Sequence, residues 1–151
     1  MRRFTLDTGT GWRGSYDPER YERLSFVGAT ESFRDGTNTP RAFLERCLES
    51  VYELEPSVRA FAYFDAEAAR LAADESTARY RAGRAIGPLD GCPFGIKDTI
   101  ETKDMPMQQN APLFKGWSGG RDAACVWALR QAGSVIFGKT QVPEYAMGKS
   151  P

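Results

Sequence analysis

The chain has 151 residues, 41% of them hydrophobic and 26% charged, which is the composition of an ordinary globular domain. Its 20 basic and 20 acidic residues balance to a formal net charge of zero, and no segment gathers basic residues. Neither a nucleic-acid partner nor an anionic membrane surface is therefore indicated. Histidine is absent, which excludes a Ser-His-Asp or Cys-His catalytic site and a histidine-ligated metal within these residues.

The first 38 residues are expected to form an irregular arm, apart from a short helix over residues 17–24. Thr39 and Pro40 are typical of a helix start, and apolar residues then recur at helical spacing. This pattern predicts an amphipathic helix that ends before Pro56. The apolar stripe of this helix is expected in the core and comprises Phe43, Leu44, Cys47, Leu48, Val51 and Leu54.

Residues 58–64 favour a short strand, and a lead into the next helix is the alternative. Asp65 is placed to cap a helix that runs to about Arg81 and ends at Gly83. The alanine-rich face of this helix permits close packing, and we see no catalytic group in it.

A second strand is predicted at residues 93–97, directly after a turn rich in proline and glycine. Alternation along a strand puts Phe94 and Ile96 on one face and Lys97 on the other. Because helical patterns flank this strand, helices are expected to cover both faces of the sheet. Lys97 is therefore expected to lie mostly out of water.

Residues 99–120 form a long connecting loop, which is a candidate wall of a substrate site because long ordered connections are often functional. Within it, residues 108–110 either contact substrate or lie in a solvated loop. Asp122 is placed to cap a helix that Gly133 ends, and residues 134–137 predict a further strand. The order strand, helix, strand predicts a parallel β-α-β crossover, so the fold class is α/β.

A lysine within an apolar strand requires a chemical or structural reason. An ordinary lysine, with a pKa of about 10.4, is about one part in a thousand neutral near pH 7.5, and burial lowers that pKa. A desolvated Lys97 is therefore a candidate general base or proton relay. The alternative is an ammonium group paired with Asp98 or Asp104, and spacing alone does not separate the two.

The cysteines, Cys47, Cys92 and Cys125, are odd in number and far apart, which predicts reduced thiols rather than disulfides. A nucleophilic Cys92 is disfavoured because nothing nearby in the sequence is placed to act as its base. No apolar run is long enough for a membrane helix, and the N-terminus lacks the apolar core of a signal peptide. We expect a cytoplasmic protein that acts on small neutral or weakly charged molecules.

Residues 133–140 match the phosphate-loop pattern Gly-x-x-x-x-Gly-Lys-Thr letter for letter. A phosphate loop follows a strand and opens a helix, whereas a predicted helix precedes this segment and its middle residues favour a strand. We interpret the match as accidental and nucleotide binding as the rival hypothesis. Lys139 and Glu144 are interpreted as a structural ion pair or a helix entry, with a place beside a ligand site as the alternative.

Several motifs occur in an order that closely resembles the amidase signature family. They are Gly-Pro-Leu-x-Gly-x-Pro-x-x-Ile-Lys-Asp at residues 87–98, Asp-Ala-Ala-Cys-Val at 122–126, Leu-Arg-x-Ala-Gly-x-Val-Ile-x-Gly-Lys-Thr at 129–140, and Pro-Glu at 143–144. The resemblance implies that residues 39–151 are the N-terminal portion of an α/β/α sandwich with a mixed β-sheet, truncated at its C-terminal end, behind an arm over residues 1–38.

Members of that family hydrolyse or transfer amides with a serine nucleophile, a bridging serine held by a cis peptide bond, and a lysine. Lys97 matches the lysine and is the one catalytic residue that the resemblance assigns here. Both serines belong to a Gly-Ser-Ser-Gly-Gly type segment, which this sequence does not reach before Pro151. The resemblance therefore implies an amidase that needs no metal or organic cofactor, and a 151-residue fragment that is inactive alone.

The implied substrate is a small-molecule amide, and a homodimer of the full-length protein is left open. An aminoacyl-tRNA amidotransferase A-type subunit is the alternative within the resemblance. Residues 105–110 stand where relatives often carry Thr-x-Gly-Ser-like residues, so close relatives do not define the substrate. A noncatalytic interaction module is the alternative of a different class, and it would require the chain to fold alone with its sheet edges covered.

Overall fold

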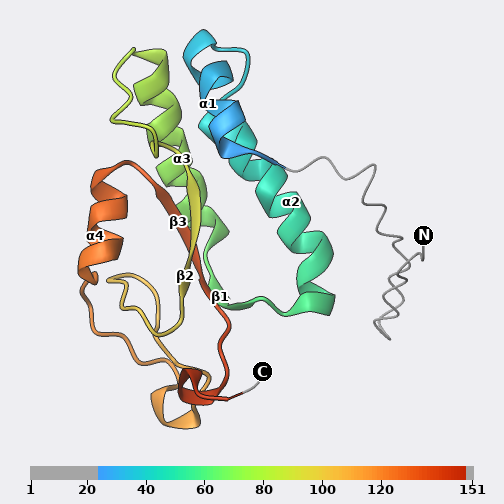
Figure 1. The fold of residues 1–151 in the computed structure, drawn as a ribbon, viewed down its shortest axis with the longest axis vertical. Helices are drawn as coiled ribbons and strands as arrows, with labels where there is room; N and C mark the ends of the chain where they lie inside the picture. Colours follow the sequence, from blue (N-terminus) through green and yellow to red (C-terminus); the bar gives the residue numbers. More distant parts are fainter. Residues whose placement is uncertain (1–23, 149–151) are drawn as a thin grey trace.

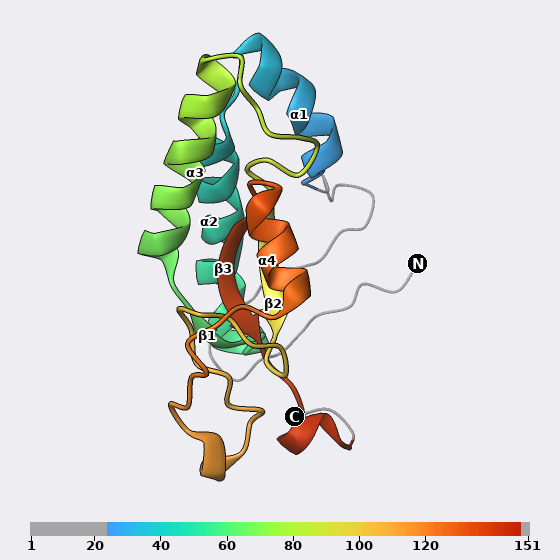
Figure 2. The same ribbon diagram turned by 90° about the vertical axis from the view of Figure 1, so that its left-hand side faces the viewer.

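A three-stranded sheet separates two layers of helices in the computed structural model, which describes residues 24–148 (Figure 1). Helices α2 and α3 cover one face and α4 covers the other, while α1 packs beside the α2 and α3 layer (Figure 2). The elements in chain order are α1 (Phe26–Asp35), α2 (Pro40–Val58), β1 (Phe61–Phe64), α3 (Ala66–Arg81), β2 (Pro93–Lys97), the 3₁₀ turn η1 (Pro112–Phe114), α4 (Ala124–Gln131), β3 (Val135–Thr140) and the 3₁₀ turn η2 (Glu144–Ala146).

The central strand of the sheet is β3, which pairs antiparallel with β1 and parallel with β2. The predicted β-α-β crossover is therefore confirmed, and so is the α/β fold class with a mixed sheet. The central strand continues to Thr140, three residues beyond its predicted end at residue 137. Parallel strands need such a crossover because a tight turn cannot join them.

The core beneath α2 and α3 is built from leucines of α2 and alanines of α3 that pack on β3. Thr39 caps α2 by accepting the backbone N–H of Ala42 at 3.1 Å, and Asp65 caps α3 by accepting that of Ala68 at 2.9 Å, as predicted. Small alanine side chains let α3 approach the sheet closely. The buried residues of this cluster are Leu44, Leu48, Ala69, Ala73, Val135 and Phe137.

The prediction of an irregular arm over residues 1–38 is wrong for Phe26–Asp35, which form α1. Gly36 ends this helix in the left-handed conformation, and Phe33 packs its ring against Phe43 and Tyr80. Burial of aromatic side chains, which local composition does not reveal, stabilises the helix. All but the last residue of the helix predicted at residues 17–24 lie outside the described residues.

Helix α2 continues two residues past Pro56, so the prediction that it ends before this proline is wrong. A proline removes one helical hydrogen bond, and bonds at the helix end offset that loss. Arg59, in the left-handed conformation, donates its backbone N–H to the Glu55 carbonyl at 2.9 Å. The Glu55 carboxylate accepts the backbone N–H of Phe61 and that of the preceding residue, each at 3.0 Å. The strand predicted at residues 58–64 therefore begins at Phe61.

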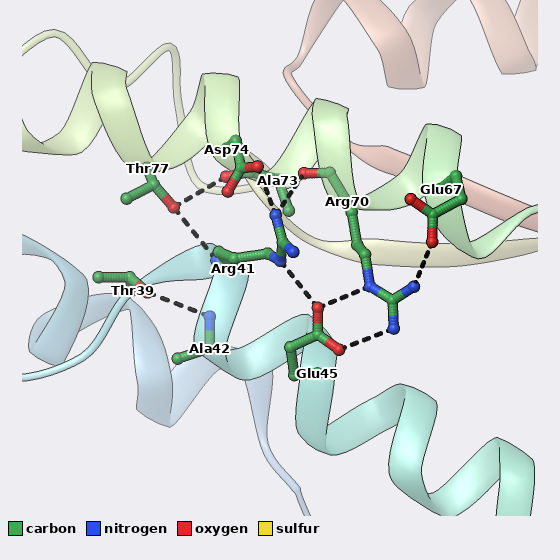
Figure 3. A network of polar contacts seen from close by, with 9 residues as sticks. All are labelled: Thr39, Arg41, Ala42, Glu45, Glu67, Arg70, Ala73, Asp74 and Thr77. Carbon is green, nitrogen blue, oxygen red and sulfur yellow. Dashed lines mark hydrogen bonds and ion pairs between the residues drawn. The ribbon is translucent and has the colours of Figure 1, made fainter.

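A chain of ion pairs joins α2 to α3 (Figure 3). Glu45 accepts hydrogen bonds from Arg70 and Arg41, each at 2.8 Å from Nε, while Arg41 also binds Asp74 and Arg70 binds Glu67 at 2.6 Å. These two guanidinium groups lower the pKa of Glu45 to about 2. Because the side chains are partly exposed, each pair contributes little to the free energy of folding.

The turn before β2 is built on a buried carboxylate. Asp90 has no exposed surface and accepts hydrogen bonds from Ser76 at 2.8 Å, from Arg79 Nη2 at 2.6 Å and from the backbone N–H of Ile86 at 3.0 Å. Burial alone would raise the pKa of Asp90, but the hydrogen bonds from Arg79, Ile86 and Ser76 outweigh burial and lower it. This cluster ties the N-terminal end of β2 to α3.

The core beneath α4 contains Ile96 of β2 and Ile136 of β3. The predicted cap of α4 by Asp122 is wrong, because the N-cap position is Ala123 and carries no side-chain bond. Asp122 instead accepts the backbone N–H of Lys103 at 2.9 Å and so ties the connecting loop to the start of the helix. Among residues 24–148, no helix combines the length and apolar character that crossing a bilayer demands.

Candidate functional site

Lys97 is the last residue of β2 and pairs in the parallel ladder with Thr140, the last residue of β3. The connecting loop and the η2 turn both lie at this end of the sheet (Figures 1 and 2). In open α/β sheets, ligands bind outside the carboxyl ends of the parallel strands. Lys97 therefore stands at the end of the sheet where a ligand site is expected.

Lys97 is exposed, so the prediction that it lies mostly out of water is wrong for the structure described by residues 24–148. Alternation places Ile96 in the core beneath α4 and Lys97 on the opposite face, as predicted. The cluster beneath α2 and α3, however, takes its sheet residues from β3 and β1 among the described residues. These two helices lie over β3 and β1, and β2 is the edge strand on the other side of β3, so Lys97 is left uncovered.

The two aspartates that could neutralise Lys97 bind other cations. Asp98 pairs with Lys139 at 3.2 Å, and both carboxylate oxygens of Asp104 lie 2.7 Å from Arg130 Nη2. No ion pair between residues 24–148 involves Lys97. The alternative in which Lys97 is paired with Asp98 or Asp104 is therefore wrong.

Lys139 is the lysine that the structure buries. Its side chain has no exposed surface, and its ammonium group donates to Asp98 Oδ1 and to the Pro106 carbonyl, each at 3.2 Å. Burial lowers the pKa of Lys139, and the hydrogen bond to Asp98 acts against that shift. The interpretation of Lys139 as part of a structural ion pair is confirmed, although its partner is Asp98 and not Glu144.

An irregularity in the β2–β3 register explains how Lys139 reaches this position. Phe94 pairs with Ile136, but Gly95 pairs with Gly138, so β3 holds one extra residue there. An extra residue reverses the alternation of side chains beyond it. Lys139 therefore pairs with Ile96 and shares its face, beside Asp98, instead of facing α2 and α3.

The connecting loop folds back onto Asp98. The carboxylate accepts the backbone N–H of Gln108 at 3.1 Å and that of Gln109 at 2.8 Å. The Gln108 side chain then accepts the N–H of Gly116 at 2.8 Å, which closes the loop internally. Gln108 and Gln109 are half-buried and Asn110 is exposed. The backbone at Gln108 and Gln109 cannot turn toward solvent without breaking its bonds to Asp98.

The rival chemistries receive no support from the geometry. Val135–Thr140 form the central strand with a helix before it, which is the reverse of a phosphate loop. Burial, together with the nearby Cys47, raises the pKa of the Cys92 thiol to about 11, so Cys92 stays protonated and poorly nucleophilic at neutral pH. Cys47, Cys92 and Cys125 are free thiols, as predicted. Within the described part of the chain, no three acidic or cysteine side chains gather as metal ligands would.

The sequence analysis considered Asp98 only as a possible partner of Lys97 and missed its role in holding the connecting loop. The strand alternation that sends Lys97 to one face puts Asp98 on the other, with Ile96, where a charge requires a partner. That signal is present in the sequence. The partner, Lys139, is not deducible in the same way because its facing depends on the extra residue in β3.

Comparisons with known proteins agree with the motifs. Residues 42–150 match the family model described as Amidase. The glutamyl-tRNA(Gln) amidotransferase A-type subunit from Acidothermus cellulolyticus is 42% identical over 103 residues, which is 68% of this chain and 20% of the relative. Its counterpart from Thermobifida fusca is 40% identical over 128 residues, covering 85% of this chain and 26% of the relative.

Among solved structures, the native peptide amidase from Stenotrophomonas maltophilia superposes with a TM-score of 0.76 at 27% identity. The match covers 83% of this chain and 26% of that one, so the chain spans about a quarter of the length of the proteins it resembles. The sheet, its crossover and the motif that carries Lys97 all lie within the matched residues. On this agreement of sequence, family model and fold, the chain belongs to the amidase signature family.

Proposed function

We propose that this chain supplies the proton-transfer lysine, Lys97, of an enzyme that hydrolyses carboxylic amides to an acid and ammonia or an amine. The placement of Lys97 carries the proposal. It is exposed at the carboxyl end of β2, while Asp98 and Asp104 bind other cations. A lysine without a carboxylate partner is free to exchange its proton with a reacting group.

In the proposed reaction, a nucleophilic serine attacks the amide carbonyl carbon and gives its proton to a bridging serine, which passes its own proton to the neutral amine of Lys97. The C–N bond then breaks, and the proton returns through the same relay to the leaving nitrogen. Water attacks the resulting acyl-serine ester, which releases the acid and restores the serine. Backbone amides beside the serines would hold the oxyanion.

Both serines would come from a Gly-Ser-Ser-Gly-Gly type segment, which the 151 residues do not contain. The 151 residues are therefore expected to be inactive alone. Such a segment would also have to cover Lys97, because removal from water favours the neutral amine over the ammonium form. Neither a metal nor an organic cofactor is required by this chemistry. The cytoplasmic location and the homodimer of the full-length protein stay predictions.

Sequencing the source DNA past the codon for Pro151 tests the first requirement. An open frame that continues into the serine-rich segment would support the proposal. A stop codon directly after Pro151 would remove the catalytic role of Lys97 and favour a noncatalytic module instead.

Turnover by the complete protein tests the role of Lys97 itself. Lys97→Ala is expected to lower kcat at least about a hundredfold, the lower end of what a general base contributes. Lys103→Ala is the matched control, because Lys103 is also exposed and contacts Asp122 through its backbone N–H, which the substitution keeps. Normal turnover in Lys97→Ala would overturn the assignment.

An amidotransferase A-type subunit is the second candidate, favoured by identities of 42% and 40% to glutamyl-tRNA(Gln) amidotransferase subunits against 27% to the peptide amidase. The two candidates share Lys97 and differ in the molecule that receives or loses nitrogen. Release of ammonia from simple amides by the protein alone would favour the hydrolase. Amidation of glutamyl-tRNA(Gln), with no turnover of simple amides, would favour the amidotransferase.

A further inference from the structure

Two fully buried charged side chains adjoin Lys97. Asp98 follows Lys97 in the chain. Lys139 precedes Thr140, which is the residue that pairs with Lys97 in the ladder. Neither charged group reaches the face on which Lys97 is exposed, so neither is placed to exchange a proton there. Their contacts nevertheless surround the backbone of Lys97.

The carboxylate of Asp98 gathers donors from two distant segments. Gln108 and Gln109 donate their backbone N–H groups at 3.1 and 2.8 Å, and Lys139 Nζ donates at 3.2 Å. Lys139 Nζ also reaches the carbonyl of Pro106 at 3.2 Å. Both members of the buried pair thus bind residues 106–109 of the connecting loop: the carboxylate binds backbone N–H groups, and the ammonium group binds a backbone carbonyl.

The same pair is continuous with the bonds that hold Lys97. The backbone N–H of Asp98 donates to the Thr140 carbonyl at 3.1 Å, and the N–H of Ile100 donates to the Lys97 carbonyl at 2.9 Å. The turn that begins at Lys97 is therefore held on one side by the ladder and on the other by the bond from Ile100, and Asp98, whose carboxylate is buried, lies within it. A shift of Asp98 would move the Cα atom from which the Lys97 side chain extends.

The docked loop also fixes the η2 turn. The carbonyl of Gln109 accepts the backbone N–H of Tyr145 at 2.9 Å, and the ring centroid of Tyr145 lies 6.2 Å from that of Phe114. Figure 2 shows the loop and the η2 turn at the same end of the sheet, where β2 and β3 end. One buried ion pair therefore organises the backbone of Lys97 and two segments beside it.

We propose that Asp98 and Lys139 are positioning residues for Lys97, acting by docking residues 106–109 against the ends of β2 and β3. The inference rests on the proposed function of Lys97 and adds two residues that never meet the substrate. Misplacement of a reacting group by about an ångström is enough to lower a rate about a hundredfold, so loss of this docking is expected to act mainly on kcat.

Three variants of the complete protein test the proposal: Asp98→Asn, Lys139→Gln and the two together. Each single change leaves one buried charge without its partner and is expected to lower kcat at least about tenfold, with a smaller change in KM. In the double variant, no buried charge is left unpaired, and the side-chain oxygen of Asp98→Asn keeps an acceptor for the backbone N–H groups of Gln108 and Gln109. The double variant is expected to recover most of the lost kcat.

Arg79→Gln is the matched control, because it unpairs the other buried carboxylate, Asp90, at the opposite end of β2. It is expected to lower stability and to leave kcat per folded molecule unchanged. If the Asp98 and Lys139 variants behave in the same way, with unchanged kcat per folded molecule, the pair is structural and the positioning role is overturned.

Amide hydrogen exchange provides a readout that does not depend on turnover. The N–H groups of Gln108, Gln109 and Ile100 are expected to exchange at least about tenfold faster in the single variants than in the parent protein, and not in Arg79→Gln. Unchanged exchange at these amides would also overturn the docking. If Lys97→Ala keeps full activity while these amides respond as expected, the proposed function fails and the docking of the loop stands.

Discussion

The two ends of β2 are each built on a fully buried aspartate, and the two aspartates are held differently. Asp90, before the strand, is bound by Arg79, whose side chain is 25% exposed. Asp98, after the strand, is bound by Lys139, which like Asp98 has no exposed surface. The cation that neutralises Asp90 is thus partly solvated, whereas the cation that neutralises Asp98 is fully buried.

This difference separates a structural role from a positioning role. The guanidinium of Arg79 keeps part of its hydration and makes several bonds to one carboxylate, which ties α3 to β2. Lys139 loses its hydration entirely, and full desolvation of both charges offsets much of their attraction. A buried pair of that kind is weak evidence for stability, so its value here lies in the loop segments that it holds together.

The largest effect on stability is expected from Lys139→Met. This change leaves the carboxylate of Asp98 buried with backbone donors alone, and unpaired buried charges typically cost about 3 to 5 kcal/mol in the free energy of unfolding. Arg79→Met is expected to cost less, about 2 kcal/mol, because water can reach Asp90 through the space that the partly exposed side chain vacates. Denaturant unfolding of both variants measures the difference.

Lys103→Met is the control for these two changes, since Lys103 is exposed and a surface substitution there is expected to stay within about 0.5 kcal/mol. A larger loss in Arg79→Met than in Lys139→Met would reverse the comparison and make the N-terminal end of β2 the more costly one to disturb.

Gly133→Ala is the next largest expected effect and acts at the Asp90 end. A Cβ atom there would lie 2.5 Å from Asp90 Oδ1, and the backbone has φ of 83°. The left-handed conformation costs an alanine about 1 kcal/mol or more, and the displaced carboxylate raises the expected loss to about 3 kcal/mol. Gly83→Ala, at φ of 65° with nothing within 4 Å, carries the backbone cost alone.

The free energy of unfolding of the two glycine variants therefore isolates the contribution of close packing against Asp90. Equal losses in both would show that the buried carboxylate moves aside freely and that the N-terminal end of β2 is less rigid than its bonds imply.

The strand at Lys97 was predictable, but its surroundings were not. Alternation placed Ile96 and Lys97 on opposite faces, because that follows from the backbone geometry of any strand. Burial of Lys97 was inferred from helices on both sides in the sequence, and it failed because α2 and α3 lie over β3 and β1 and do not extend over β2. Sequence order gives the crossover and does not give the width of the sheet.

The errors at the helix ends share a different cause. Pro56, Asp122 and the start of α1 were each judged from local preference, and each was decided by a contact with another segment. Glu55 closes the end of α2, Lys103 engages Asp122, and the ring of Phe33 meets those of Phe43 and Tyr80. Caps without such competition, at Thr39 and Asp65, were predicted correctly.

Glu45 carries the smallest expected effect and extends the comparison to a carboxylate near the surface. Its folded pKa of about 2 lies below its ordinary value of 4.5, so the pairing with Arg41 and Arg70 stabilises the fold fully above about pH 4.5 and is lost as pH falls toward 2.

Glu45→Gln is expected to cost less than about 1 kcal/mol at pH 7, since the group is partly solvated. The difference in unfolding free energy between parent and variant is expected to shrink as pH falls from about 5 toward 2. If the difference grows as pH falls, the carboxylate of Glu45 is more strongly held in its protonated form, and the ion pairs that join α2 to α3 do not stabilise their packing.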